Sequence, residues 1–258
     1  MSSRDPDAAA ALLWQAWTTG EAIPRLPAGV RPESVADRYV IQERLDALAG
    51  RRVGWKIAAT GAGGRAALGV EHPLAGPLYE RFLVAPGGEV DASALRMSTA
   101  EAEFGFEIGV DLPAADAPFG RQAVREALGA FVPAIELPDT RYEDHRAVGG
   151  AQLVADAACA GVYAFGERVP DFDRDGLVER RLSLTSDAQG TVAGSGAKVL
   201  GDPLEAVRWL ANELAKHGRH LAAGDVVITG AAAAMRDPGP GRLVADYGDL
   251  GGLEVTLR

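Results

Sequence analysis

The stretch Ala100-Glu101-Ala102-Glu103-Phe104-Gly105-Phe106-Glu107-Ile108 decides the fold, because it alternates without a break. Alternation is the period of a β-strand, whose successive side chains leave on opposite faces. Phe104 and Phe106 are therefore expected on one face, which must be buried. Glu101 and Glu103 share the other face, so this strand predicts two carboxylates side by side on a structured surface.

Two interpretations of this acidic face are possible. Neighbouring carboxylates repel one another, and removal from water increases the penalty. A divalent cation such as Mg²⁺ or Mn²⁺ would reverse that penalty, because both ions prefer oxygen ligands. The simpler alternative is a strand edge with its acids in water, and the nine residues by themselves favour that alternative.

The composition describes an acidic globular protein. The chain has 258 residues, is 47% hydrophobic and has a formal net charge of −10, which fits one large domain or one and a half. With no basic stripe, nucleic-acid binding is not expected. No apolar run is long enough to span a membrane, and no secretory signal is apparent in residues 1–7. The single cysteine, Cys159, fits a reducing compartment, so a cytoplasmic protein is expected.

Helical periodicity marks two segments near the N-terminus and one segment later in the chain. Residues 5–19 are predicted to form an amphipathic helix, with Asp5 as N-cap and a proline next to it. A second helix is expected over 32–48, and the two would form a small helical lobe. The clearest helix spans 202–217, and a buried strand is expected over 224–230.

Lys56 is one of only three lysines in the chain, and it stands between Trp55 and Ile57 in a predicted strand. Partial desolvation there would lower the pKa of the amine and prepare it for proton transfer or anion binding. The alternative is a lysine that extends to solvent from a strand edge. The strand is expected to continue into a Gly-rich loop, 61–64, which lacks the spacing of a P-loop or a dinucleotide fingerprint.

Further polar residues follow later in the chain. Glu136 is a third acid in otherwise apolar surroundings. Asp139 and Arg141 come where that strand ends, close enough to pair with each other, and a structural ion pair is favoured over direct substrate contact. The turn Gly194-Ser195-Gly196 allows the backbone to approach a ligand and offers a hydroxyl, but it lacks the spacing of a nucleophile elbow.

Five motifs occur in one order along the chain. They are Gly54-Trp55-Lys56-Ile57, Glu101-x-Glu103, Pro133-Ala134-Ile135-Glu136 with Asp139-x-Arg141, Gly194-Ser195-Gly196 with Leu200-Gly201-x-Pro203, and Gly224-Asp225 with Thr229-Gly230. Together they resemble the 2-keto-4-pentenoate hydratase group of the fumarylacetoacetate hydrolase superfamily. The resemblance runs from about residue 10 to the end of the chain. Each motif is weak alone, and the five in this order are specific to the superfamily.

This resemblance implies an α+β fold with a mixed β-roll core and flanking helices. The chain would divide into a helical N-terminal region, residues 1–50, and a β-roll catalytic domain, residues 51–258. The resemblance also implies a divalent metal, Mg²⁺ or Mn²⁺, held by the residues that match Glu101, Glu103 and Glu136. A small 2-keto acid substrate and a homo-oligomer are implied as well.

The implied reaction is a hydration, in which water adds to a 2-hydroxy-2,4-dienoate to give a 4-hydroxy-2-oxo acid. Lys56 matches the family lysine and is assigned to the developing anion or to proton shuttling. Ser195 and the amides of Gly194–Gly196 would hold the substrate carboxylate or a water. Asp139 and Arg141 are further candidates for substrate binding.

Two positions depart from the family pattern. Leu74 stands where many hydratases and decarboxylases have an acid, and Ala157 stands where an asparagine is common. Loss of the acid removes a candidate proton relay for water addition. Decarboxylation of a 2-oxo acid, C–C bond hydrolysis and tautomerisation at the same metal site are therefore alternatives. A non-catalytic scaffold that keeps the fold is a further one.

Overall fold

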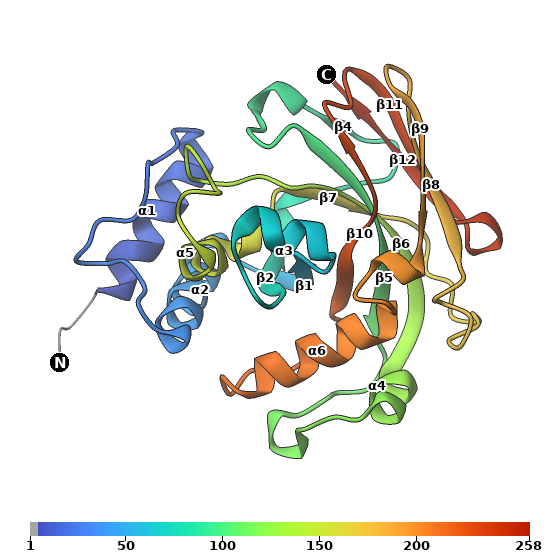
Figure 1. Ribbon diagram of the computed structural model, residues 1–258, viewed down its shortest axis with the longest axis horizontal. Coiled ribbons are helices and arrows are strands. Elements are labelled where there is room, and N and C mark those ends of the chain that lie inside the picture. The colour runs from blue at the N-terminus through green and yellow to red at the C-terminus, as the bar shows by residue number, and fades with distance from the viewer. Residues whose placement is uncertain (1–4) are drawn as a thin grey trace.

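The structure is a computed structural model that describes residues 5–258, and its centre is a mixed sheet that contains the alternating strand (Figure 1). The strand order of this sheet is β2 (Leu74–Tyr79), β1 (Arg52–Ala58), β10 (Val226–Arg236), β5 (Thr99–Ile108), β6 (Leu128–Leu137), β7 (Val162–Phe165) and β3 (Leu83–Val84). β5 pairs antiparallel with both β10 and β6, whereas β1 pairs parallel with β10. The predicted strand over 100–108 is confirmed.

A second sheet packs against the apolar face of the first. Its order is β4 (Glu89–Val90), β12 (Gly252–Leu257), β11 (Gly241–Asp246), β8 (Arg181–Ser186) and β9 (Gly190–Ser195). Tyr247, which follows β11, crosses between the sheets, and its hydroxyl lies within hydrogen-bond distance of the carbonyls of Glu103 and Ala134, at 2.7 and 2.8 Å. Its ring meets Phe104 and Phe131 edge-on. The apolar face of β5 is therefore buried between two sheets, as its alternation predicts.

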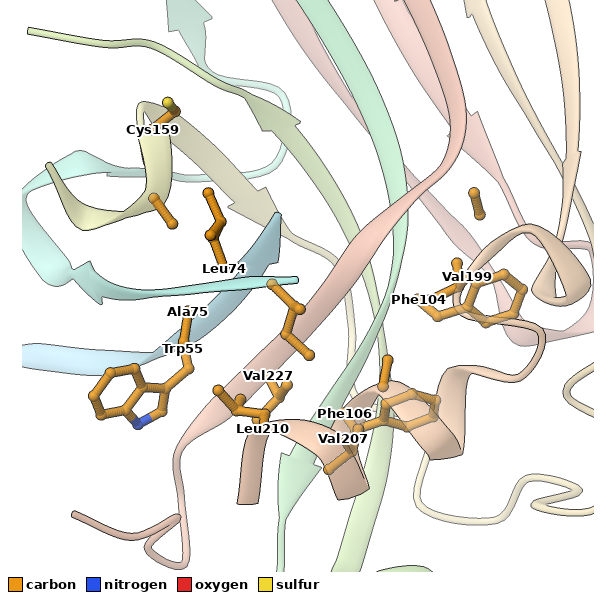
Figure 2. Packing of buried hydrophobic residues seen from close by; sticks show 14 of the residues in the cluster. Trp55, Leu74, Ala75, Phe104, Phe106, Cys159, Val199, Val207, Leu210 and Val227 are labelled. Atoms are coloured by element: carbon orange, nitrogen blue, oxygen red, sulfur yellow. The ribbon is translucent and has the colours of Figure 1, made fainter. Parts of the chain in front are cut away.

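Helices flank this core, and the predicted α+β class is confirmed. They are α1 (Pro6–Thr19), α2 (Val35–Ala49), α3 (Ala62–Leu68), α4 (Arg121–Ala127), α5 (Gly150–Ala155) and α6 (Pro203–Ala215). In Figure 1 α1 and α2 lie on the side of the first sheet away from the second. Figure 2 shows Val207 of α6 beside Phe106 and Leu210 of α6 beside Val227. Among residues 5–258, no helix is both long and apolar enough to cross a membrane.

The helix ends follow capping chemistry. Asp5 caps α1 as predicted, since its carboxylate accepts the N–H of Ala8 at 2.9 Å. The second helix begins three residues later than predicted, because Ser34 and Asp37 form a capping box. Residues 1–4 of the predicted helical region lie outside the described residues, and the division of the chain at residue 50 stays a prediction.

The predicted Gly-rich loop over 61–64 is wrong, because this segment opens helix α3. Gly61 is its N-cap, and Arg65 donates to the carbonyls of Ala59 and Thr60, which ties the helix to the end of β1. Glycines lower helix propensity, but the tertiary contacts of a short helix override such local preferences. The consequence is a helix placed directly beyond the strand that contains Lys56.

A left-handed turn over residues 157–159 packs against β2. Ala157, Ala158 and Cys159 have φ values of 51°, 52° and 60°, a conformation that costs about 1–2 kcal/mol for each non-glycine residue. Gly76 of β2 makes the approach possible, because a Cβ there would lie 1.9 Å from the carbonyl oxygen of Ala157. The turn places the carbonyl of Ala158 next to Lys56, which pairs with Gly76 across β1 and β2.

We expect Gly76→Ala to destabilise the protein by about 1–3 kcal/mol, because the added methyl group meets backbone that cannot move away alone. Urea denaturation followed by circular dichroism measures the change. Gly63→Ala is the matched control, since a Cβ at Gly63 in α3 would meet nothing within 4 Å. An unchanged unfolding midpoint for Gly76→Ala would contradict the tight contact.

Candidate functional site

Three carboxylates from two neighbouring strands converge on one face of the first sheet. Glu101 of β5 lies directly opposite Glu136 of β6, and Glu103 follows two residues further along the same face of β5. One carboxylate oxygen from each residue lies within 4.8 Å of the others. The predicted meeting of the three acids from two separate segments is confirmed in its geometry.

The cluster is buried and incompletely hydrogen-bonded. Glu103 and Glu136 have no exposed surface, whereas Glu101 is partly exposed. Glu103 Oε2 accepts the N–H of Gly230 at 2.6 Å. Within residues 5–258, Glu103 Oε1 and Glu136 Oε1 accept no hydrogen bond. Buried carboxylate oxygens without donors are costly, so the cluster is arranged for a positively charged partner.

Lys56 of β1 supplies one positive charge to the cluster. Its ammonium lies 2.9 Å from Glu136 Oε2 and donates to the carbonyl of Ala158 at 3.2 Å. The alternative of a lysine that reaches solvent is wrong, because its side chain is only 3% exposed.

The acids and the lysine shift one another's pKa values. Burial, followed by the charge of Glu136, raises the pKa of Glu101 to about 7. Burial and the two neighbouring carboxylates raise the pKa of Glu103 well above its usual value. Burial opposes the charged form of Lys56, but the carboxylates outweigh it, so its pKa is raised. The sequence predicted a lowered pKa for Lys56. That prediction was wrong because it considered desolvation but not the three neighbouring acids.

The donor set fits a hard divalent cation. When all three acids are ionised, their charge exceeds that of the one ammonium by two, and a divalent cation balances the difference. All three donors are oxygen, which suits Mg²⁺, Mn²⁺ or Ca²⁺ rather than a soft or imidazole-preferring metal. The oxygens that accept no hydrogen bond offer the ligand atoms such an ion needs.

A cavity of about 590 Å³ opens in front of Glu101 and Lys56. Its walls come from β1, α3, β5, β10, the left-handed turn and the loop after β6. These lining residues include Ala58, Thr60, Leu68, Leu74, Met97, Thr99, Pro138, His145, Arg146, Ala158, Cys159, Ala231, Ala234 and Arg236. Leu74 thus lines the cavity as an apolar side chain at the position where an acid is common.

Sequence reasoning missed the basic part of this wall, His145, Arg146 and Arg236. The predicted strand over 224–230 ended too early, because β10 continues to Arg236. The continuation is a run of four alanines after Gly230, and alanine and glycine have little strand preference. Strand pairing with β5 provides the order that the local sequence does not signal.

The predicted ion pair between Asp139 and Arg141 is wrong. Arg141 pairs with Asp156, and its Nη1 and Nη2 donate to the carbonyls of Ala160 and Asp156, each at 2.6 Å. Asp139 instead accepts the backbone N–H of Arg96 at 2.8 Å. Asp156 is fully buried, and a buried carboxylate requires a charged partner more than a boundary one does. Neither Asp139 nor Arg141 is among the described residues that line the cavity.

Arg141 instead clamps the left-handed turn. It binds the carbonyls on both sides of residues 157–159, and Thr140 adds a hydrogen bond to the Asp156 carboxylate at 2.8 Å. The guanidinium also stacks 3.8 Å from the ring centre of Trp17 in α1. This network holds the turn that supplies the Ala158 carbonyl to Lys56, so Arg141 acts on the site through the backbone.

The glycines of the predicted Gly194-Ser195-Gly196 turn serve close backbone packing. A Cβ on Gly194 would lie 2.4 Å from the carbonyl oxygen of Ala232, and one on Gly196 would lie 1.9 Å from that of Leu177. The structure does not bring Gly194, Ser195 or Gly196 into the described lining of the cavity. Their assignment to a substrate carboxylate or a water stays a prediction.

Comparisons with known proteins find relatives over most of the chain. The chain is 34% identical over 248 residues to 2-keto-4-pentenoate hydratase of Paraburkholderia xenovorans (strain LB400), which is 93% of this chain and 90% of that protein. It is also 34% identical over 229 residues to 4-oxalocrotonate decarboxylase of Pseudomonas putida, 86% of this chain and 85% of that one. No protein-family model matches the chain.

Solved structures share the fold of this chain. 4-Oxalocrotonate decarboxylase from Pseudomonas putida G7, complexed with magnesium and adipate, matches with a TM-score of 0.87 and 29% identity over 98% of this chain and 97% of that one. Fumarylpyruvate hydrolase from Pseudomonas aeruginosa, in complex with Mn²⁺ and pyruvate, shares the fold with a TM-score of 0.60 and 17% identity over 80% and 89% of the two chains. The predicted fumarylacetoacetate hydrolase-like fold is confirmed.

We expect Mn²⁺ or Mg²⁺ to raise the melting temperature, and the increase to grow from pH 5 to pH 8. The folded pKa of Glu101, about 7, lies above the unfolded value of roughly 4.3. This group therefore makes the metal-free protein less stable as the pH rises through that interval, whereas a bound cation replaces the proton. Scanning calorimetry with metal and with EDTA measures the difference. Glu103→Gln should lose most of it, and equal melting temperatures at pH 8 would contradict the site.

We also expect Arg141→Met to destabilise the protein by about 3–5 kcal/mol, because the Asp156 carboxylate would stay buried without its partner. Guanidinium denaturation gives the change in the free energy of unfolding. Arg125→Met is the control, since its ion pair with Asp175 lies at the surface and should contribute little. Equal effects of the two substitutions would contradict the buried clamp.

Proposed function

The chain belongs to the 2-keto-4-pentenoate hydratase group of the fumarylacetoacetate hydrolase superfamily, and from this premise we propose that it is a divalent-metal-dependent hydratase. It adds water to a 2-hydroxy-2,4-dienoate and yields a 4-hydroxy-2-oxo acid. The observation that carries the proposal is the three-carboxylate cluster beside Lys56, from which Glu101 and Lys56 line a cavity. We also propose that the protein acts as a homo-oligomer in the cytoplasm.

Glu101, Glu103 and Glu136 would hold the cation, Mg²⁺ or Mn²⁺. When bound, it supplies Lewis acidity toward the carboxylate and the 2-oxygen of a 2-oxo or 2-hydroxy acid. The relative solved with magnesium and the one solved with Mn²⁺ support either ion. Gly230 orients Glu103 through its N–H, which binds Oε2 and leaves Oε1 without a donor.

Lys56 is charged at neutral pH, and it stabilises negative charge on the substrate. An ammonium has three N–H donors. The Glu136 carboxylate and the Ala158 carbonyl occupy two of them, so one is available for a substrate oxygen. A buried ammonium next to a developing anion lowers the barrier to enolate formation and can return the proton to carbon or oxygen. Leu68, Leu74 and Met97 provide an apolar wall for the hydrocarbon part of the substrate.

Decarboxylation of a 2-oxo acid is the second candidate, because it needs no activated water and the match to 4-oxalocrotonate decarboxylase covers most of the chain. Water addition uses a group that activates the water, and Leu74 provides none at a position where an acid is common. Decarboxylation at the same site would need only Lys56 and a bound cation, which together withdraw electrons from the 2-oxo acid. Hydration is preferred because the sequence match to the hydratase covers 93% of the chain, against 86% for the sequence match to the decarboxylase.

The deciding experiment incubates the metal-loaded protein with 2-hydroxypenta-2,4-dienoate and, separately, with oxaloacetate. Hydration predicts loss of the dienol absorbance, a product heavier by one water, and no CO₂ from oxaloacetate. A product of unchanged mass would show tautomerisation, and CO₂ release would show decarboxylation. Either result without the hydrated product contradicts the proposal.

We expect Lys56→Met to lower kcat/KM by about 10²–10⁴-fold, since it removes both the charge and the transferable proton. Steady-state kinetics on the dienoate measures the loss, and calorimetry with metal shows that the variant is folded and still binds the cation. Activity within threefold of the unsubstituted protein would remove Lys56 from the mechanism.

A further inference from the structure

The wall of the cavity that contains Arg146 and Arg236 has excess positive charge. Both side chains line the cavity together with Glu101 and Lys56, and both are exposed. Within the part of the chain that the structure describes, neither guanidinium makes a hydrogen bond or an ion pair, and only the backbone N–H of Arg146 is bound, to Asp144 at 2.9 Å. By contrast, Arg125, with Asp175, is one of many arginines in this acidic chain that pair with acids.

The strand register places this positive charge away from the carboxylates. Ala234 of β10 lies opposite Glu101, and Arg236 lies opposite Thr99, on the side of Glu101 away from Glu103. Both Ala234 and Arg236 line the cavity, so they share a face. Two residues along a strand span about 7 Å. The arginine is therefore displaced along the cavity from the position where a cation would be held.

His145 lines the same wall, and both arginines act on the pKa of its imidazole. Burial and then the charge of Arg146 lower the pKa of its imidazole, and Arg236 adds to the effect. Asp144 and Asp139 act in the opposite direction without cancelling it. The cavity lining thus places Glu101 and Lys56 in one part of the wall and Arg146 and Arg236, with His145 between charged neighbours, in another.

We propose that Arg146 and Arg236 bind an anionic group at the distal end of the substrate, so that the preferred substrate is a 2-hydroxydienoate with a second carboxylate. This inference rests on the proposed function, which places the 2-oxo acid head at the carboxylate cluster. Arginine suits such a group because its planar fork binds a carboxylate through two hydrogen bonds. A substrate with an apolar tail would leave both guanidinium groups without a partner in the complex.

The test uses two acids that do not react and that differ only at the distal end, 2-oxohexanoate and 2-oxohexanedioate. Isothermal titration calorimetry with the metal-loaded protein gives their affinities. We expect 2-oxohexanedioate to bind roughly five- to tenfold more tightly, the modest factor reflecting the solvent exposure of the arginines. The preference should shrink at high salt, which screens exposed charges.

The double substitution Arg146→Gln with Arg236→Gln should abolish the preference and leave the affinity for 2-oxohexanoate unchanged. Arg125→Gln is the matched control for the loss of a positive charge, and it should keep the preference. Equal affinities for the two acids, or a preference that survives the double substitution, would overturn the inference and leave the hydratase proposal intact. Failure of both acids to bind would overturn the inference together with the proposed function.

Discussion

The burial of three carboxylates beside one ammonium is the constraint on which the rest of the structure depends. Such a cluster is unfavourable by itself, because desolvation and mutual repulsion both oppose ionisation. It persists because β5 and β6 fix Glu101 and Glu136 opposite each other, while two packed sheets bury the other face of β5. Burial and repulsion raise the pKa values of Glu101 and Glu103, so a bound cation can take the place of their protons. The chemistry proposed for the cavity follows from that.

The surrounding elements fix the position of the Lys56 ammonium as well as the positions of the acids. Lys56 is fixed between β2 and β10, and its carbonyl partner comes from a turn in an unfavourable left-handed conformation. Arg141 binds the backbone carbonyls on both sides of that turn and also pairs with the buried Asp156 carboxylate. The path from Arg141 to Lys56 explains why a residue outside the cavity can matter to its chemistry, and it connects stability to function in one network.

The sequence allowed the central strand and the acidic face to be predicted, because alternation is a local signal. It also allowed Glu136 and Lys56 to be singled out, as polar residues in apolar strands. Pairing partners could not be predicted in the same way: Arg141 was matched with the nearby Asp139, whereas its partner Asp156 is brought close only by the fold. The sign of the Lys56 pKa shift depended on three acids from other strands. Arg236 was missed because an alanine run gives no strand signal, and its order comes from pairing with β5.

The metal centre is tested most simply by the metal content of the purified protein. The protein is loaded with Mn²⁺, excess ion is removed, and the bound metal is measured by inductively coupled plasma mass spectrometry. We expect one divalent ion per chain. Glu136→Gln should lose that ion, whereas its circular dichroism spectrum should be unchanged. A folded protein that retains no ion, or a Glu136→Gln variant that retains it fully, would contradict the claim that these three carboxylates form a metal centre.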